Sequence, residues 1–181
     1  MKGLTLIELM IGVALLTILL SVGVPGVHEL IEKYQANTSV STLKQVFMRA
    51  RTVALDKEIS VTSCPMRNNA CSTDWSDTLT VFADINNNQA LDLDEPIYFR
   101  TEMAISTGYW LKKRANSPYV KFSPQGHAFS TATTFLYCPS SSKLQLAKQL
   151  VINFQGRIRI GHYLNQNGTP YSTIAPLACR S

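Results

Sequence analysis

The hydrophobic pattern begins with one long apolar segment near the start of the chain. Leu4 to Val24 is a run of 21 residues whose only charged side chain is Glu8. As a helix, this run would cover about 30 Å, which is the thickness of the hydrocarbon core of a bilayer. A secretory signal peptide would differ, with more basic residues before the run and a small-x-small cleavage site after it. The pattern therefore predicts a helix that can span a membrane.

Helical periodicity continues after this segment. Pro25 would end or kink the helix, but the apolar spacing resumes behind it and predicts one long helix that ends near Asp56. Residues 25–57 are amphipathic and should lay their apolar stripe on a sheet, with Arg49 and Arg51 as solvated charges. The apolar positions are Val27, Leu30, Ile31, Tyr34, Leu43, Val46, Phe47, Ala50 and Ala54.

From residue 58 the pattern changes to short runs of β-branched and aromatic residues bounded by Gly, Pro, Asn and Ser, which is typical of strands. Strands this short and numerous favour antiparallel sheets over βαβ units. No internal repeat is found, so residues 58–181 are predicted to form one β-rich domain. The expected fold class is α+β, a long helix packed on a small antiparallel β-sandwich. The predicted strands are Ile59–Cys64, Thr78–Ala83, Ile97–Arg100, Tyr119–Ser123, Thr133–Tyr137, Leu150–Phe154 and Arg157–Ile160.

The four cysteines all lie beyond the membrane segment, and in an exported domain they indicate two disulfides, for which three connectivities are allowed. We favour Cys64 with Cys71, which closes a short loop, and Cys138 with Cys179, which ties the C-terminal tail to a strand. A zinc site is the alternative. It is disfavoured because neither pair has the two-to-four-residue spacing of a zinc knuckle and no histidine sits beside them.

Charge is distributed unevenly along this chain, whose formal net charge is +5. Residues 1–102 contain 8 basic and all 12 acidic residues, whereas residues 103–181 contain 9 basic residues and no acidic one. A purely basic half indicates a polyanionic partner or anionic lipid, unless it is only a solvated positive surface.

Glu8 is the informative residue of the apolar segment, because a carboxylate among apolar side chains costs a few kcal/mol unless a partner compensates it. If the chain were cut after Gly3, the new amino group of Leu4 would lie one helical turn from Glu8. In a bundle of such helices, the amine of one subunit could neutralise the carboxylate of another. This arrangement predicts a filament subunit.

The segment Gly3-Leu4-Thr5-Leu6-Ile7-Glu8 resembles the class III leader of type IV pilins and pseudopilins. The resemblance implies that residues 1–3 are a leader, that a prepilin peptidase cuts after Gly3 and methylates the new amine, and that Glu8 serves membrane extraction and filament docking. Leu4 stands where the family usually has Phe. The alternative is a membrane anchor of residues 4–24 that is never cut.

The sharpest candidate for a binding site is Gly156-Arg157-Ile158-Arg159-Ile160. In a strand, Arg157 and Arg159 would share one face, about 6.6 to 6.8 Å apart along the backbone, while the two isoleucines would face the core. That spacing is roughly two phosphate steps of 3.4 Å, and arginine can grip phosphate with a bidentate fork. Gly156 would mark a turn or bulge close to a ligand. Two arginines on an edge strand can also serve only to discourage aggregation.

Other positively charged residues support this candidate. Lys143, Lys148 and Arg180 belong to the same acid-free half. The cluster Tyr109-Trp110-Leu111-Lys112-Lys113-Arg114 mixes stacking groups with positive charge, as nucleic-acid surfaces often do.

The chain further resembles the FimT/GspH family of minor pilins and pseudopilins over nearly its whole length. The family implies a long helix packed on a small β-sandwich. In its FimT branch, a C-terminal GRxR sequence binds DNA for natural transformation, and here it falls on Gly156, Arg157 and Arg159. The residues that carry the resemblance are Arg51 with Ala54, the cysteine loop, Trp75, Val81 to Asp84, Asp92 to Glu95, Phe122 to Gly126 and Val151 to Arg159.

A second constellation matches a calcium loop in part. Asp84, Asn86, Asn88, Asp92 and Glu95 fall at positions 1, 3, 5, 9 and 12 of such a loop. The glycine required at position 6 is replaced, and the flanks are predicted strands. We therefore favour a hairpin loop whose Asn and Asp side chains cap their own backbone, and we expect no cofactor.

Enzymatic interpretations find little support. Two S-x-x-K sequences, starting at Ser41 and Ser140, lack the partner motifs of that class of enzyme. The histidines His28, His127 and His162 are scattered without a nucleophile or an acid in a recognisable arrangement. The protein is not expected to be an enzyme.

The prediction is a minor type IV pilin, anchored in the bacterial inner membrane with its C-terminal domain in the periplasm, and then incorporated into a pilus. It would bind extracellular DNA without sequence specificity for uptake. The alternative is a structural minor pilin or type II secretion pseudopilin that primes assembly and never binds DNA. The expected partners are DNA, other pilins, the prepilin peptidase and the inner membrane.

Overall fold

The computed structural model describes residues 5–68, 70–103, 108–113, 117–128, 131–141, 143–164, 168 and 179, without the side chains of residues 22, 24 and 25. The chain divides after Tyr34 into two compact units. The helix α1 (Leu6–Lys57) is continuous through Pro25 and ends one residue beyond the predicted Asp56. By length and apolar composition, its first half meets the criterion for a membrane span.

The second half of α1 carries the core of the second unit. Its buried residues recur every three or four positions and form one stripe. Both sheets contribute to the same core, for example through Val81 and Phe135. By contrast, the apolar side chains of Val27, Leu30 and Tyr34 are exposed. The buried stripe consists of Ala36, Val40, Leu43, Val46, Phe47, Ala50 and Ala54.

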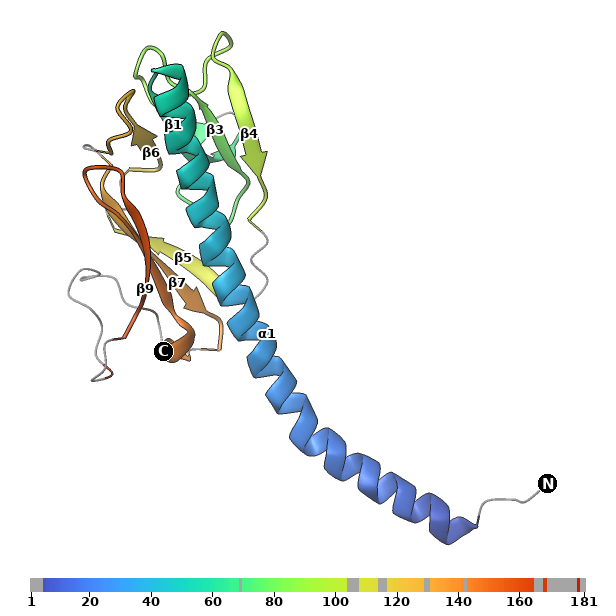
Figure 1. Ribbon diagram of the computed structural model, residues 1–181. Helices are drawn as coiled ribbons and strands as arrows, with labels where there is room; N and C mark the ends of the chain where they lie inside the picture. Colours follow the sequence, from blue (N-terminus) through green and yellow to red (C-terminus); the bar gives the residue numbers. More distant parts are fainter. Residues whose placement is uncertain are drawn as a thin grey trace. The chain divides into compact units, whose positions relative to one another are not determined.

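The strands form two antiparallel sheets beside this stretch of α1 (Figure 1). In the first sheet the order is β2-β1-β3-β4, and β6 also pairs with β1. The order in the second sheet is β5-β7-β8-β9, which makes β9 an edge strand. The predicted α+β fold with antiparallel sheets is confirmed. The strands are β1 (Val61–Arg67), β2 (Ala70–Cys71), β3 (Leu79–Ala83), β4 (Ile97–Thr101), β5 (Gly108–Lys112), β6 (Val120–Phe122), β7 (Thr133–Pro139), β8 (Lys148–Ile152) and β9 (Ile158–His162), with a 3₁₀ turn at Leu144–Leu146 before β8.

Each predicted strand overlaps an observed one, but β2 and β5 were missed. The residues of β5 were expected to belong to a basic surface cluster. In the structure its Trp110 is 8% exposed and packs edge-to-face on Phe135 and Tyr137. Most of the Tyr109–Arg114 cluster therefore belongs to a strand in which alternate side chains point into the core.

Two disulfides tie down loops of the second unit. Cys64–Cys71 links β1 to β2, and Cys138–Cys179 links β7 to a residue 41 positions later. These are the pairs that the sequence analysis favoured, and none of the cysteines is free. Closing loops of these lengths removes unfolded-state entropy worth about 2.5 kcal/mol for the short loop and about 4 kcal/mol for the long one.

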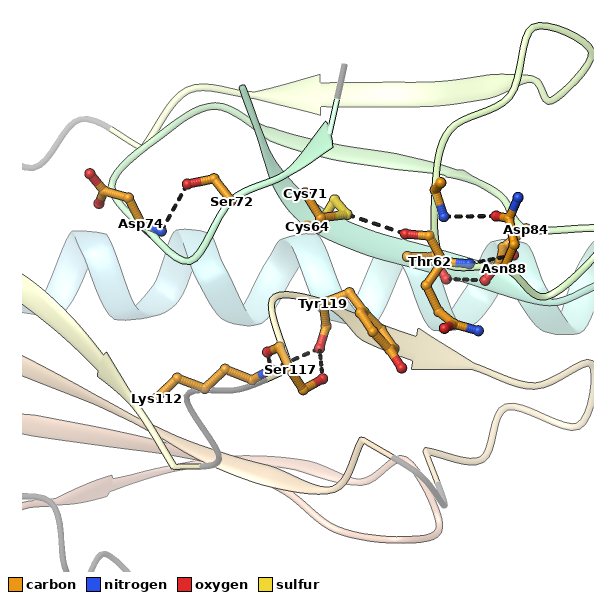
Figure 2. Close-up of a disulfide and its surroundings, with 12 residues drawn as sticks. Thr62, Cys64, Cys71, Ser72, Asp74, Asp84, Asn88, Lys112, Ser117 and Tyr119 are labelled. Carbon is orange, nitrogen blue, oxygen red and sulfur yellow. Dashed lines mark hydrogen bonds between the residues drawn. A yellow bond between two sulfur atoms is a disulfide. The ribbon is translucent and has the colours of Figure 1, made fainter. Parts of the chain in front are cut away.

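Lys112 is a lysine buried in the core, 7% exposed. Its Nζ donates hydrogen bonds to the carbonyl oxygens of Ser117 and Tyr119, the latter at 2.8 Å (Figure 2). The ammonium also lies 5.2 Å from the centroid of the Trp75 ring. Burial lowers the pKa of Lys112 from its ordinary value of 10.5 to about 7. The Lys112 side chain therefore links β5 by hydrogen bonds to the segment that leads into β6.

Arg51 connects α1 to two turns of the β-domain. Its Nε donates to the carbonyl oxygen of Gly126 at 2.9 Å, and its Nη2 donates to that of Gln155 at 3.3 Å. Gly156 lies directly against this contact with a φ of +72°, and a Cβ there would lie 2.1 Å from the Gly126 oxygen. The expectation that Arg51 is a solvated helix charge is wrong, because carbonyl groups far away in sequence capture its guanidinium.

Arg49 also differs from its expected role as a simple solvated charge. Its guanidinium carbon lies 4.1 Å from the centroid of the Phe99 ring on β4. This is a cation–π contact between the helix and the first sheet, of a kind worth about 0.5–1 kcal/mol at an exposed site.

We expect Lys112→Met to weaken the pH dependence of stability. In the folded state Lys112 has the lower pKa, about 7 against 10.5, so between these values the unfolded chain binds more protons. The free energy of unfolding of the unmodified protein should therefore rise with pH across this window and be lowest below it. Urea unfolding at about pH 6 and about pH 9 measures this rise. This increase in the free energy of unfolding should be smaller in Lys112→Met and should persist in the neighbouring control Lys113→Met. An equal increase in all three proteins would contradict the burial of the Lys112 amine.

We also expect Gly156→Ala to destabilise the protein more than Gly168→Ala. Both glycines have a φ of +72°, but of the two only Gly156 has neighbours within 4 Å of an added Cβ among the described residues. The left-handed conformation alone costs alanine about 1–2 kcal/mol. Any further loss of unfolding free energy in Gly156→Ala measures the effect of the close approach of the Gly126 carbonyl. Equilibrium denaturation compares the two variants, and an equal loss in both would argue against this tight packing.

Candidate functional site

The connection between β8 and β9 is a closed turn that presents Arg157. The Gly156 amide donates to the Asn153 carbonyl oxygen at 2.9 Å, and the Asn153 amide donates to the Arg157 carbonyl oxygen at 3.1 Å. The Asn153 side chain adds a third bond, accepting from the Arg157 amide at 2.8 Å. Together with the Arg51 bond to Gln155, these contacts fix the turn at both ends. The predicted role of Gly156 as a turn residue agrees with this geometry.

Arg157 and Arg159 are both exposed, but they occupy different settings. Arg157 precedes β9, whereas Arg159 lies within it and pairs with Val151 of β8. Strand alternation places Arg159 on the sheet face opposite Leu150 and Ile152, which belong to the core. Neither arginine side chain has a hydrogen-bond or ion-pair partner among the described residues.

Both isoleucines of this segment lie on the core side of the sheet, as predicted, but only one of them is packed against the core. Ile158 packs against the main core, whereas Ile160 is 41% exposed. Because β9 is the edge strand, only β8 flanks it within the sheet. The core therefore covers the start of β9 and not its middle.

Arg157 also borders a hollow of about 280 Å³ between the turn and α1. This hollow contains positive, polar and apolar side chains but no acidic one. Sequence reasoning missed this grouping, because the helix residues and the turn are about a hundred positions apart. The lining residues are Lys44, Met48, Arg51, Thr52, Leu55, Gly156, Arg157 and Ile158.

Phe154 is another residue that sequence reasoning missed. It lies in the turn before Arg157 and is 53% exposed. A second hollow, of about 360 Å³, is lined in part by Phe154, Val151 and Lys113. Val151 faces the same side of the sheet as Arg159, whereas Lys113 follows β5 at the opposite edge, so this hollow lies across β7 and β8.

The supporting lysines lie farther along the sheet. Lys148 pairs with His162 at the other end of β8, about 10 Å along the strand from Val151. Its Nζ is 3.2 Å from Nδ1 of His162. Lys143 is exposed and precedes the 3₁₀ turn. Arg180 lies outside the described residues.

The Tyr109–Arg114 cluster does not form the expected surface. Trp110 and Lys112 are buried, because they point to the core side of β5. Tyr109 and Leu111 pack against a smaller apolar cluster on the other face. Arg114 lies outside the described residues, so Lys113 is the described cation of this cluster that is not buried.

In the proposed calcium loop, the buried Asp84 already has protein partners. Its Oδ2 accepts from Thr62 Oγ1 at 2.8 Å (Figure 2). The same oxygen lies 3.3 Å from the ammonium of Lys121. Its Oδ1 accepts from the amide of Gln89, which has a φ of +63° at the position where a calcium loop has glycine. A lysine therefore supplies the positive charge beside Asp84.

The other carboxylates of this loop also accept hydrogen bonds from the loop itself. Glu95 accepts from the amides of Ile85 at 2.7 Å and Asp92 at 3.2 Å. Asp92 accepts from the side-chain amides of Asn86 and Asn88. In the part of the chain that the structure describes, no group of three His, Cys, Asp or Glu residues is placed to hold a metal. These side chains stabilise the loop, which is the interpretation that the sequence analysis favoured.

At the start of α1, Thr5 and Glu8 form a capping box. The Thr5 amide donates to Glu8 Oε2 at 3.0 Å, and the Glu8 amide donates to Thr5 Oγ1 at 3.3 Å. These bonds satisfy two amides that have no partner within the helix. The T-x-x-E spacing is a sequence signal for this cap. Gly3 and Leu4, where processing is expected, lie outside the described residues.

Comparison with known proteins supports the family. The family model for the type II transport protein GspH matches residues 39–156, a segment that ends just before Arg157. No curated protein sequence matches this chain significantly.

Two crystal structures of the type IV minor pilin FimU from Pseudomonas aeruginosa strain PAO1 are similar to this chain. Their TM-scores are 0.57 and 0.53, each at 18% identity, and they cover 73% and 69% of this chain and 92% and 91% of the FimU chain. At this identity the likeness establishes the fold alone. Because the GspH model matches more than half of the residues, the chain belongs to the GspH family of structural, non-enzymatic pilin-like proteins, and its fold is that of a type IV minor pilin.

Proposed function

We propose that this protein is a minor pilin that binds DNA without sequence specificity for uptake during natural transformation. The observation that carries the proposal is the pair Arg157 and Arg159, two exposed guanidinium groups without an acidic partner among the described residues. They lie at the edge of a sheet, where a long ligand can approach without rearrangement of the fold.

The chemistry of these groups suits a phosphate backbone. Guanidinium groups form bidentate hydrogen bonds with phosphate and remain charged at any physiological pH. Contacts to phosphate carry no sequence information, so binding would be general. The exposed ring of Phe154 offers an additional surface on which a base of single-stranded DNA can stack. Lys143 and Arg180 would extend the positive surface, whereas strand alternation puts Lys148 on the sheet face opposite Arg159.

In this proposal the chain is processed as its leader suggests. Residues 1–3 are removed by a prepilin peptidase, and residues 4–24 hold the protein in the inner membrane before assembly. Residues 25–57 continue the helix into the periplasm, where residues 58–181 form the exported domain. Other pilins are then its partners in the filament, with Glu8 placed to meet the amine of a neighbouring subunit.

The DNA proposal is tested by titrating the full-length protein in detergent with duplex DNA at two salt concentrations. We expect Arg157→Gln/Arg159→Gln to weaken binding at least about tenfold, since one phosphate contact accounts for a factor of several at moderate salt. The dependence of log K on log salt should also become shallower by about 1.8, because each lost phosphate contact removes about 0.9. Arg100→Gln, at an exposed position on β4 of the other sheet, is the control and should bind normally.

Unchanged binding in the double variant would exclude this site. The alternative, a purely structural pilin, predicts a different phenotype in cells. There, loss of both arginines should reduce piliation together with DNA uptake, whereas a DNA receptor should keep normal pili and lose uptake alone.

A further inference from the structure

The hollow between α1 and the β8–β9 turn is built from one face of the helix. Lys44, Met48, Thr52 and Leu55 follow one another at helical spacing and so lie on the same side of α1. The turn closes the other side. The hollow, about 280 Å³ in volume, lies entirely within the second compact unit.

Its positive charges have no negative counterpart. Arg51 is held by two carbonyl oxygens and not by a carboxylate. Lys44 and Arg157 have no ion-pair partner among the described residues, and no acidic side chain lines the hollow. Three like charges grouped in this way repel one another, and the repulsion is relieved when an anion enters.

The Arg51 guanidinium and the backbone of the turn are held in place before any ligand arrives. The bonds from Arg51 to Gly126 and Gln155 hold its guanidinium in place and fix the turn that carries Arg157. Its Nη1 makes no hydrogen bond among the described residues. Lys44 is half-buried beside this fixed charge. Preorganised donors of this kind lose little conformational freedom on binding.

We propose that this hollow binds a backbone phosphate of DNA, contacted by Lys44 and Arg157, with Arg51 as the residue that positions the turn that carries Arg157. The inference rests on the proposed function and extends it from the sheet edge onto the helix. Arg157 belongs to both surfaces, so a strand that meets Arg159 continues into the hollow. Met48 and Leu55, which are 50% and 46% exposed, face the deoxyribose carbons on either side of the phosphate.

The first test is the salt dependence of duplex binding by full-length Lys44→Gln in detergent. Removal of one phosphate contact should weaken binding about three- to tenfold and reduce the slope of log K against log salt by about 0.9. Lys44→Arg should restore both. The matched control is Arg49→Gln, which removes one positive charge from the same helix at a position outside the hollow. It should bind as the unmodified protein does.

The second test observes the hollow directly. In protein labelled with ¹³C at the methionine methyl groups, the Met48 signal should shift when a short duplex is added, because Met48 lines the hollow. Met103 is buried in the core and should not shift. Loss of the Met48 shift in Lys44→Gln, with the other methyl signals in place, would separate a binding role from a folding defect.

Each result decides between the proposals. If Lys44→Gln binds normally while Arg157→Gln/Arg159→Gln does not, the helix hollow is wrong and the DNA function stands. If neither variant changes binding, or the unmodified protein does not bind DNA, both proposals fall. If Lys44→Gln leaves DNA binding intact but reduces piliation, the hollow accepts an acidic side chain of a neighbouring pilin, which overturns the phosphate assignment.

Discussion

The apolar stripe of α1 is the surface on which the second compact unit is assembled. The two sheets lie beside this stretch of helix and share a single core with it. Phe47 makes the connection most directly, because its ring packs against both Trp75 and Phe135, with centroids 6.0 and 5.3 Å away. Burial of a side chain of this size contributes about 1.5–3 kcal/mol. The packing of both sheets therefore depends on the second half of α1.

Beyond the apolar stripe, the hydrogen bonds of Arg51 fix the conformation of the β8–β9 turn. Arg51 joins helix and turns through main-chain oxygens, and the absence of a Cβ at Gly156 is what allows the Gly126 carbonyl to approach. Within the GRxR sequence, the glycine thus has a structural role that stands independently of any ligand. The two arginines, by contrast, make no side-chain contact that the described fold requires. In this short motif, the glycine determines the conformation of the turn, and the neighbouring arginines supply the charged groups.

Sequence patterns predict those features that depend on local periodicity. The helix, its apolar stripe and most strands follow from spacing alone. The β5 strand was missed because Trp110 and Lys112 belong to a string that resembles a basic surface, and burial of a lysine is decided by the carbonyl groups that receive it. The role of Arg51 was equally hidden, since its partners lie 75 and 104 positions away. Such contacts are set by the tertiary structure and leave no periodic signal.

The same long-range contacts determine the order in which the chain can fold. The helix precedes every strand and needs only local hydrogen bonds, whereas β1 also pairs with the distant β6, with Val61 opposite Phe122. Folding dominated by such distant pairings is slow. During that delay the stripe around Phe47 has no sheet to cover it, and exposed apolar surface promotes aggregation. If the first half of α1 is anchored in a membrane, as the proposed function requires, the anchor would also keep such partly folded chains apart from one another.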